Sequence, residues 1–213
     1  LQRYAFIKFL LLLGVSILGF SYDAVADNYP SKSIRLIVPY AAGGSTDLTA
    51  RLIAKSLSNA LGQSVVVDNR AGAGGTIGHD IVAKAVPDGY TILFSAAGPL
   101  VVSPNTYAKL NYDPLKSFDP IVLIATQPLL LVVNPNSKIH SIADLLKEAK
   151  EKKGNLNYGS FGNGSAAHLA AESFKIATKT EMVHVPYKGS SPALAALMAG
   201  EIDLMFDVFS TAA

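Results

Sequence analysis

The sequence predicts an α/β fold in which helices connect parallel strands. Half of the 213 residues are hydrophobic and 16% are charged, so the chain can bury a sizeable core. Short apolar segments alternate with segments of helical periodicity along most of its length. This alternation is typical of parallel sheets with helical crossovers, and it runs in two successive units.

The first 26 residues predict a secretory signal peptide. Arg3 and Lys8 flank an apolar run at 9–20, and small residues follow at 24–26. The run is shorter than the ~20 residues needed to cross a bilayer. We expect cleavage after Ala26 and a mature protein outside the cytoplasm. The chain has no cysteine, which excludes a lipid-modified cysteine and disulfides.

The first unit, residues 27–127, is predicted to be a β-α-β-α-β arrangement. Its predicted elements are a strand at 34–38, a helix with an apolar face at 48–57 that ends at Gly62, a strand at 65–67, a helix at 76–86 and a strand at 90–95. Four prolines between 99 and 120 predict an irregular connection there rather than a long helix.

The second unit, residues 128–213, is predicted to repeat the alternation after a boundary near Gln127. Apolar β segments are expected at 121–126 and 129–133, on either side of that boundary. The other predicted elements are a helix at 142–154 with Ser141 as N-cap, strands at 156–159, 182–185 and 202–206, and helices at 166–177 and 192–198.

Three predicted strand-to-helix junctions consist of glycine and small hydroxyl residues. They lie at 43–47, 72–76 and 162–165. In an open parallel sheet such junctions lie at the carboxyl ends of strands, where ligands bind. Glycine lets backbone N–H groups approach an anion, and a helix N-terminus supplies unpaired N–H donors. A carboxylate or phosphate site without lysine is therefore predicted, although each loop alone also fits a tight turn with Ser45, Thr46 or Ser165 as N-cap.

Several polar residues have two interpretations. His168 lies one turn into its helix, where it can donate a hydrogen bond to a ligand or be a partly buried helix histidine. Asp47 can contact a ligand amine or hydroxyl, or it can stabilise the N-terminus of its helix. Asp207, expected at the end of the 202–206 strand, has the same two interpretations. The turn at 187–189 can face the ligand cleft or be a solvated loop.

Other function classes find little support. The formal net charge of +2 gives no basic surface for nucleic acid. The four histidines, at 79, 140, 168 and 184, lack the close spacing of metal ligands, so no metal site is expected. There is no Gly-x-Ser-x-Gly motif, and we predict no catalytic residues and no cofactor. The segment 162–167 fits the dinucleotide fingerprint loosely, but Glu181 begins its strand rather than ending it.

Several segments, in this order, resemble the substrate-binding proteins of tripartite tricarboxylate transporters, the Bug family. The matching segments are 38–47 with Ala50 and Arg51, 68–78, 87–91, 112–114, 164–165 with His168, Leu169 and Glu172, 185–189, and 200–203. The resemblance implies a periplasmic-binding-protein-like fold, with two α/β lobes that close around a small carboxylate. It also implies a monomer that delivers a tricarboxylate, dicarboxylate or related acid to membrane permease subunits.

The resemblance also implies which residues contact the ligand. The residues from the first lobe are Tyr40, Ala41, Gly43, Gly44, Ser45 and Asp47, those from the second are Ser160, Gly164, Ser165 and His168, and those at the rim are Asn69, Ala96 and Asp207. A periplasmic sensor for a two-component system is the alternative function, and an exported nucleotide-binding enzyme is a remote one.

Family members are longer than this chain. The sequence begins with Leu1 rather than Met and stops just after an apolar, strand-like run. We therefore expect sequence beyond Ala213 that completes the first lobe. We also expect residues 27–213 alone to bind ligand poorly or not at all.

Overall fold

The computed structural model describes residues 28–152 and 154–212. The predicted signal peptide and its cleavage site lie outside this part of the chain. Within it, none of the helices has both the length and the apolar character required to span a bilayer. Residues 32–213 cluster as one unit that contains two β-sheets.

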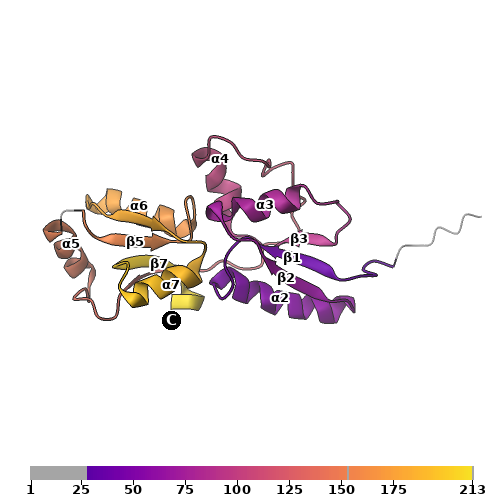
Figure 1. Ribbon diagram of the computed structural model, residues 1–213, viewed down its shortest axis with the longest axis horizontal. Coiled ribbons are helices and arrows are strands. Elements are labelled where there is room, and N and C mark those ends of the chain that lie inside the picture. Colours follow the sequence, from indigo (N-terminus) through magenta and orange to yellow (C-terminus); the bar gives the residue numbers. More distant parts are fainter. Residues whose placement is uncertain (1–27, 153, 213) are drawn as a thin grey trace, which may run out of the picture. The chain divides into compact units, whose positions relative to one another are not determined.

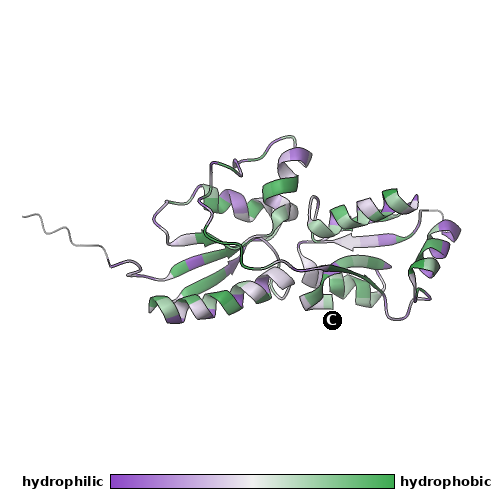
Figure 2. Ribbon diagram, turned by 180° about the vertical axis from the view of Figure 1, so that it is seen from behind, coloured by the Kyte–Doolittle hydropathy of each residue, from purple (hydrophilic) through white to green (hydrophobic). Residues whose placement is uncertain are grey.

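The first sheet consists of three parallel strands, as the sequence predicts. They are β1 (Ile34–Val38), β2 (Val65–Asn69) and β3 (Thr91–Leu93), in the order β2-β1-β3. The helices α2 (Ser45–Leu61) and α3 (Thr76–Ala83) lie on opposite faces of it (Figure 1). Because β1 is covered on both faces, its residues are almost continuously apolar, and it is coloured as largely hydrophobic in Figure 2.

The core between the first sheet and α2 confirms the predicted apolar face only in part. Its buried members are Ile34, Leu36, Val38, Ala50, Ala54 and Val65. Leu57 packs against this cluster, whereas Leu48 and Leu52 are exposed. The helix ends at Gly62, whose φ of 65° is left-handed, as the glycine predicts.

The second half of the first unit differs from the prediction in detail. Helix α3 ends at Ala83, three residues before the predicted end, and β3 is shorter than the predicted 90–95 strand. A π-type turn, η2 (Gly98–Val102), and the short helix α4 (Ser103–Thr106) interrupt the connection that was expected to be irregular. Each has a proline in its first turn, where the missing N–H costs no helical hydrogen bond.

The second sheet is mixed, which corrects the expectation of parallel sheets throughout. Its strands are β4 (Leu129–Val133), β5 (Asn157–Ser160), β6 (Val183–Pro186) and β7 (Leu204–Val208), in the order β4-β7-β5-β6. Strands β5, β6 and β7 are parallel, but β4 runs antiparallel to β7. An antiparallel edge strand on a parallel sheet is a common arrangement, and strand direction is not encoded in apolar periodicity.

Helices cover both faces of the second sheet. Helix α6 (Ala166–Thr178) lies on one face and α7 (Ser190–Ala199) on the other (Figure 1). Helix α5 (Ile142–Glu151) packs with α6 on a core that includes Leu145 and Tyr158. Its N-cap is Ser141, as predicted, whose side chain accepts a hydrogen bond from the Asp144 N–H. The short helix α8 (Phe209–Ala212) follows β7.

The predicted β segment at 121–126 is wrong. It forms no strand, and Ile121 and Leu123 are 80% and 79% exposed. Apolar residues favour a strand only where a neighbouring strand supplies backbone partners, and the described residues supply none here. Elsewhere in the second unit the boundaries shift by one to three residues: α7 begins at Ser190 rather than at Pro192, and α5 ends at Glu151 rather than at 154. The division into two domains near Gln127 stays a prediction.

Candidate functional site

Two helix N-termini without side-chain caps lie beside each other. The N-cap of α2 is Gly44 and that of α7 is Gly189, and neither provides a capping hydrogen bond from a side chain. A Cβ atom placed on Gly44 would be 3.5 Å from the backbone nitrogens of both Ser190 and Ser191. The first N–H groups of two helices, with their partial positive charge, thus gather in one place. Ser45, considered above as an N-cap, is instead the buried first residue of α2.

The loop before α2 is hydrogen-bonded to the loop before α7. The Ala41 N–H donates to the Lys188 carbonyl oxygen at 2.9 Å. Gly43 has a left-handed φ of 79°, and a Cβ on it would lie 3.4 Å from Ser191 Oγ. The turn at 187–189 therefore faces the first predicted loop rather than standing alone in solvent.

Asp47 fixes the shape of the first loop. Its buried carboxylate accepts hydrogen bonds from the Gly43 N–H, Arg51 Nε and Asn69 Nδ2, each at 2.9 Å. Burial favours the neutral acid, but these hydrogen bonds and the Arg51 charge outweigh it and hold the pKa of Asp47 below its usual value. Asn69 also donates to the Tyr40 carbonyl oxygen at 3.1 Å. Asp47 and Asn69 thus act on the loop backbone.

The second predicted loop, with η1 (Ala73–Gly75), meets the third. Tyr40 is buried, its hydroxyl lies 3.4 Å from the Gly74 carbonyl oxygen, and burial raises its pKa well above the usual value. A Cβ on Gly74 would overlap the Asn163 carbonyl oxygen. A Cβ on Gly162 would lie 2.9 Å from the Gly74 Cα. Glycine is needed at both positions because the two backbones touch.

The third loop, at 162–165, is held by side chains of the second sheet and α6. The buried Ser160 Oγ lies 2.6 Å from His184 Nε2 and accepts a hydrogen bond from the Gly162 N–H at 3.1 Å. Ser165 is the N-cap of α6, as its sequence position predicts, and accepts from the His168 N–H at 3.3 Å. The Gly164 N–H donates to His168 Nδ1 at 3.2 Å.

Gly98 and Ser103 bring the end of the first sheet to this third loop. A Cβ on Gly98 would lie 2.8 Å from the Gly164 carbonyl oxygen. The fully buried Ser103 Oγ has no hydrogen-bond partner in the part of the chain that is described, and a Cβ on Gly164 would be 3.6 Å from it. Ala96, a predicted rim residue, is exposed two residues before Gly98.

Asp207 is fully buried inside β7, not at the end of a strand as expected. The strand ends at Val208 rather than at Phe206, which places Asp207 within it. Its Oδ1 accepts a hydrogen bond from Ser190 Oγ at 2.8 Å, and its Oδ2 has no partner among the described residues. Asp207 is therefore in contact with the first residue of α7.

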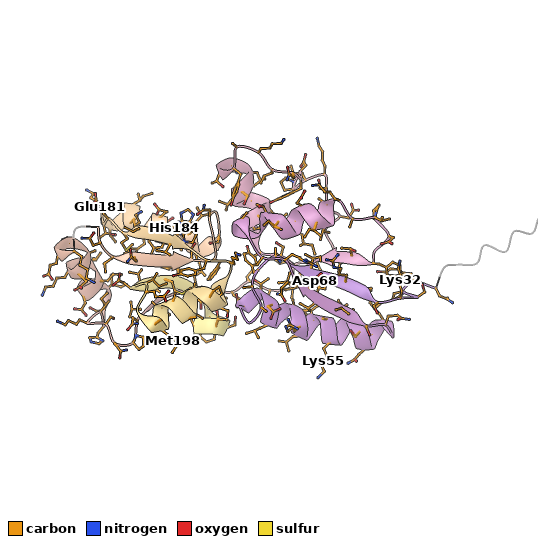
Figure 3. All side chains as sticks on the ribbon, viewed as in Figure 1. Lys32, Lys55, Asp68, Glu181, His184 and Met198 are labelled. Carbon is orange, nitrogen blue, oxygen red and sulfur yellow. The ribbon has the colours of Figure 1, made fainter. Side chains whose placement is uncertain are left out.

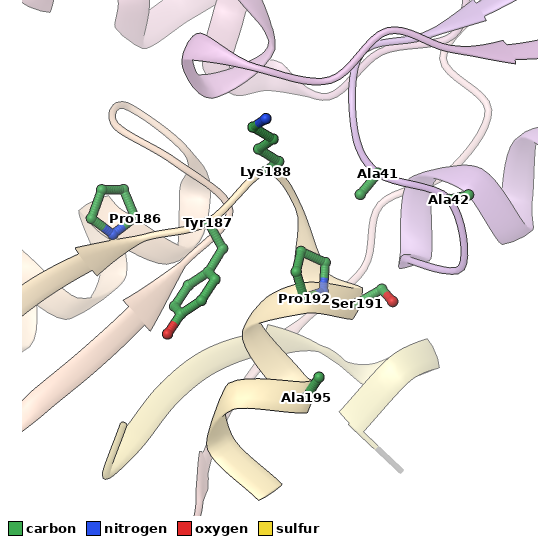
Figure 4. A pocket seen from close by; sticks show the side chains of 8 residues that line it. All are labelled: Ala41, Ala42, Pro186, Tyr187, Lys188, Ser191, Pro192 and Ala195. Atoms are coloured by element: carbon green, nitrogen blue, oxygen red, sulfur yellow. The ribbon is translucent and has the colours of Figure 1, made fainter. Parts of the chain in front are cut away.

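A cavity of about 630 Å³ adjoins the first loop (Figure 4). Its lining residues are Ala41, Ala42, Pro186, Tyr187, Lys188, Ser191, Pro192 and Ala195. The walls are mostly apolar and contain one cationic side chain, Lys188. Among the predicted site residues, only Ala41 lines this cavity.

The N-terminus of α7 was not predicted to be part of the site. Gly189, Ser190 and Ser191 form a fourth junction of glycine and small hydroxyl residues, followed by Pro192 and an apolar helix. That signal is of the same kind as the three that were recognised. His184 was considered only as a metal ligand, and its contact with Ser160 depends on the pairing of β5 with β6. Among the described residues, no group of three or more histidines and acids has the arrangement of a metal site.

Comparison with known proteins identifies the family. The profile of the tripartite tricarboxylate transporter family receptors matches residues 49–213. The protein BugT of Bordetella pertussis is 40% identical over 198 residues, which cover 92% of this chain and 61% of BugT.

Two solved structures of Rhodopseudomonas palustris proteins are also similar. One, with adipate, has a TM-score of 0.83 and 40% identity, over 86% of this chain and 61% of that one. The other, MatC with bound malate, has a TM-score of 0.81 and 33% identity, over 86% of this chain and 63% of MatC. The chain thus spans less than two thirds of the length of these relatives. The α/β fold matches that of periplasmic binding proteins, and the chain belongs to the family of tripartite tricarboxylate transporter receptors, as its motifs predicted.

Proposed function

We propose that this protein captures a small organic carboxylate in the periplasm and delivers it to the membrane permease of a tripartite transporter. The observation that carries the proposal is the pair of uncapped N-termini of α2 and α7. A carboxylate between them would accept hydrogen bonds from the first N–H groups of both helices without requiring a lysine. The family, whose members include periplasmic binding proteins rather than enzymes, supports the same function.

A dicarboxylate is the ligand class that we infer. Two related structures contain adipate and malate, which are both dicarboxylates. In this chain the 162–165 loop lies beside His168, whose Nδ1 accepts from the Gly164 N–H, and beside Ser103 Oγ, which has no partner among the described residues. We propose that one carboxylate of the acid binds at the two helix N-termini and that its other carboxylate contacts the 162–165 loop.

Loop contacts between the two sheets support capture by closure. The hydrogen bond from Ala41 to Lys188 and the backbone contact of Gly74 with Asn163 link the carboxyl ends of both sheets. A ligand that touches both sets of loops favours the conformation in which they meet, because it binds the separated loops less well. We propose that the ligand-free receptor populates a form in which these contacts are open, and that it works as a monomer exported by a cleaved signal peptide.

A thermal-shift screen tests the binding proposal. The protein encoded by the whole reading frame would be heated with adipate, malate and citrate, and with the dimethyl ester of adipate as a matched uncharged control. A ligand at a hundred times its dissociation constant stabilises the folded state by about 2.7 kcal/mol. We expect a dicarboxylate to raise the melting temperature by several degrees and the ester to leave it unchanged. A folded protein that none of the acids stabilises would contradict the ligand class.

Delivery to a permease requires a separate experiment. Uptake of the radiolabelled acid that the screen identifies would be measured in cells with and without the gene for this receptor. We expect uptake to be lost without the receptor and restored when the gene is supplied on a plasmid. Unchanged uptake, together with tight binding in vitro, would favour a sensor over a transport receptor.

A further inference from the structure

Three aromatic rings form a continuous stack beside the 162–165 loop. Tyr158 of β5 stacks on His184 of β6, with ring centroids 4.9 Å apart and an interplanar angle of 17°. His184 in turn stacks on His168 of α6, with centroids 4.1 Å apart and an angle of 11°. Figure 3 labels His184 on the second sheet. The stack thus joins two strands to the helix that the 162–165 loop precedes.

Hydrogen bonds determine which nitrogen of His168 carries the proton. The Gly164 N–H donates to His168 Nδ1 at 3.2 Å, so Nδ1 must hold a lone pair. In the neutral ring the proton is then on Nε2. No partner for His168 Nε2 is found among the described residues, and the ring is only partly buried. His168 therefore presents a free N–H donor while its other nitrogen holds the loop.

His184 is held through the Ser160 hydroxyl. Ser160 Oγ donates to the Gly162 carbonyl oxygen at 3.2 Å and accepts from the Gly162 N–H at 3.1 Å. Ser160 Oγ also lies 2.6 Å from His184 Nε2, so the imidazole and the start of the loop share this hydroxyl.

The charged groups that face the pair are Glu172 and Lys175, both on α6. Tyr158 OH donates to Glu172 Oε1 at 2.5 Å, and Lys175 Nζ lies 2.7 Å from the same oxygen. The Glu172 charge raises the pKa of both histidines, but burial outweighs it. Burial lowers the pKa of His168, and burial together with His168 lowers the pKa of His184 to about 4. The pair therefore stays neutral at neutral pH.

We propose that His184 is a positioning residue, which holds His168 and the 162–165 loop so that His168 Nε2–H donates a hydrogen bond to a carboxylate of the ligand. The stack sets the plane of the His168 ring, and the bond to Ser160 sets the start of the loop. This inference rests on the proposed function for its ligand. Its structural part, the tautomer of His168 and its dependence on His184, concerns the ligand-free protein.

The first test reads the tautomer by ¹⁵N chemical shifts of the imidazoles in the ligand-free protein. We expect His168 to be neutral at pH 7 with its proton on Nε2. We expect His184→Ala to disturb this state, seen as a mixture of tautomers or a raised His168 pKa, while the matched control His140→Ala leaves it unchanged. A His168 proton on Nδ1, or a tautomer unaffected by His184→Ala, would overturn the inference, whether or not any acid binds.

The second test measures the dissociation constant of adipate by calorimetry. We expect His184→Ala to weaken binding by about tenfold or more, the value of one hydrogen bond to a charged group. His184→Phe keeps the ring and His184→Gln keeps a hydrogen-bonding group for Ser160, so both should fall between the wild type and His184→Ala. A folded His184→Ala protein that binds adipate as tightly as the wild type would contradict the proposal.

Discussion

The loops at the two sheets are held by different chemistry. The loop at 43–47 is fixed by a charge, the buried carboxylate of Asp47, which binds Gly43, Arg51 and Asn69. The loop at 162–165 is fixed by neutral groups, the Ser160 hydroxyl and the stacked imidazoles. In both loops the anchoring group accepts a hydrogen bond from the N–H of a glycine, Gly43 in the first and Gly162 and Gly164 in the second. The difference predicts that the two loops fail under different conditions.

Removal of the Asp47 carboxylate should have the largest effect on stability. Asp47→Ala leaves the Gly43 N–H and the Asn69 amide without their acceptor, so we expect the free energy of unfolding to fall by about 3 kcal/mol in urea denaturation. The control Glu151→Ala removes an exposed carboxylate 3.9 Å from Lys147 Nζ and should cost only a few tenths of a kcal/mol. Equal effects of the two substitutions would mean that Asp47 does not hold the loop.

Mild acid should weaken the loop at 162–165 before the loop at 43–47. The pKa values of His168 and His184 are lowered by folding, so the unfolded chain binds more protons below pH 6.5. Above pH 6.5 both states bind the same number of protons at these histidines, so stability does not depend on them. As the pH falls from 6.5 towards 4, we expect the free energy of unfolding to decrease by roughly 2 kcal/mol. Because the pKa of Asp47 is also lowered, its contribution is lost only below its unfolded value of 3.8.

Urea denaturation from pH 7 to pH 4, compared between the wild type and His184→Gln, measures this difference. The variant cannot titrate at position 184, so its stability should depend less on pH in this window. If both proteins had the same pH profile, His184 would not be the group responsible.

Two glycines with the same backbone conformation allow the effect of backbone strain to be distinguished from the effect of the contact between loops. Gly62 and Gly74 have φ values of 65° and 63°, but only a Cβ on Gly74 meets another backbone, that of Asn163. Alanine at either position should cost about 1 kcal/mol of stability for the left-handed backbone. We expect only Gly74→Ala to weaken adipate binding in calorimetry, because it forces the two loops apart. Weaker binding by Gly62→Ala as well would point to strain rather than to the contact.

The fold was largely predictable because local patterns determine most of it. Apolar periodicity located β1, α2 and α6, and Gly62 marked the end of α2. Ser141 was identified as an N-cap from side-chain type and position alone, and Ser165 as an N-cap was one of two interpretations. The errors in the predicted fold concern contacts between elements, which local sequence patterns do not encode. An apolar run at 121–126 does not reveal that it lacks a strand partner, and the sequence of β4 does not state its direction.

The site was less predictable for the same reason. Glycine and serine indicated three of the loops, but only the folded chain brings the N-terminus of α7 beside Gly44. Nor does the sequence show that Asp47 and Asn69 act on a loop backbone, since this depends on the pairing of β1 with β2. Contact of the predicted site residues with a ligand stays a prediction.

The measurement that tests the central claim most directly is calorimetric titration of adipate into the wild type, Ser45→Ala and Ser45→Pro. Proline is tolerated at the first position of a helix and removes a single N–H there. Gly44, with φ −84° and ψ 170°, already has the extended conformation that precedes proline. Ser45→Ala removes the hydroxyl but keeps the N–H. If the N-terminus of α2 binds the carboxylate, Ser45→Pro weakens adipate binding by about tenfold and Ser45→Ala does not. Equal affinities for all three folded proteins would contradict the claim.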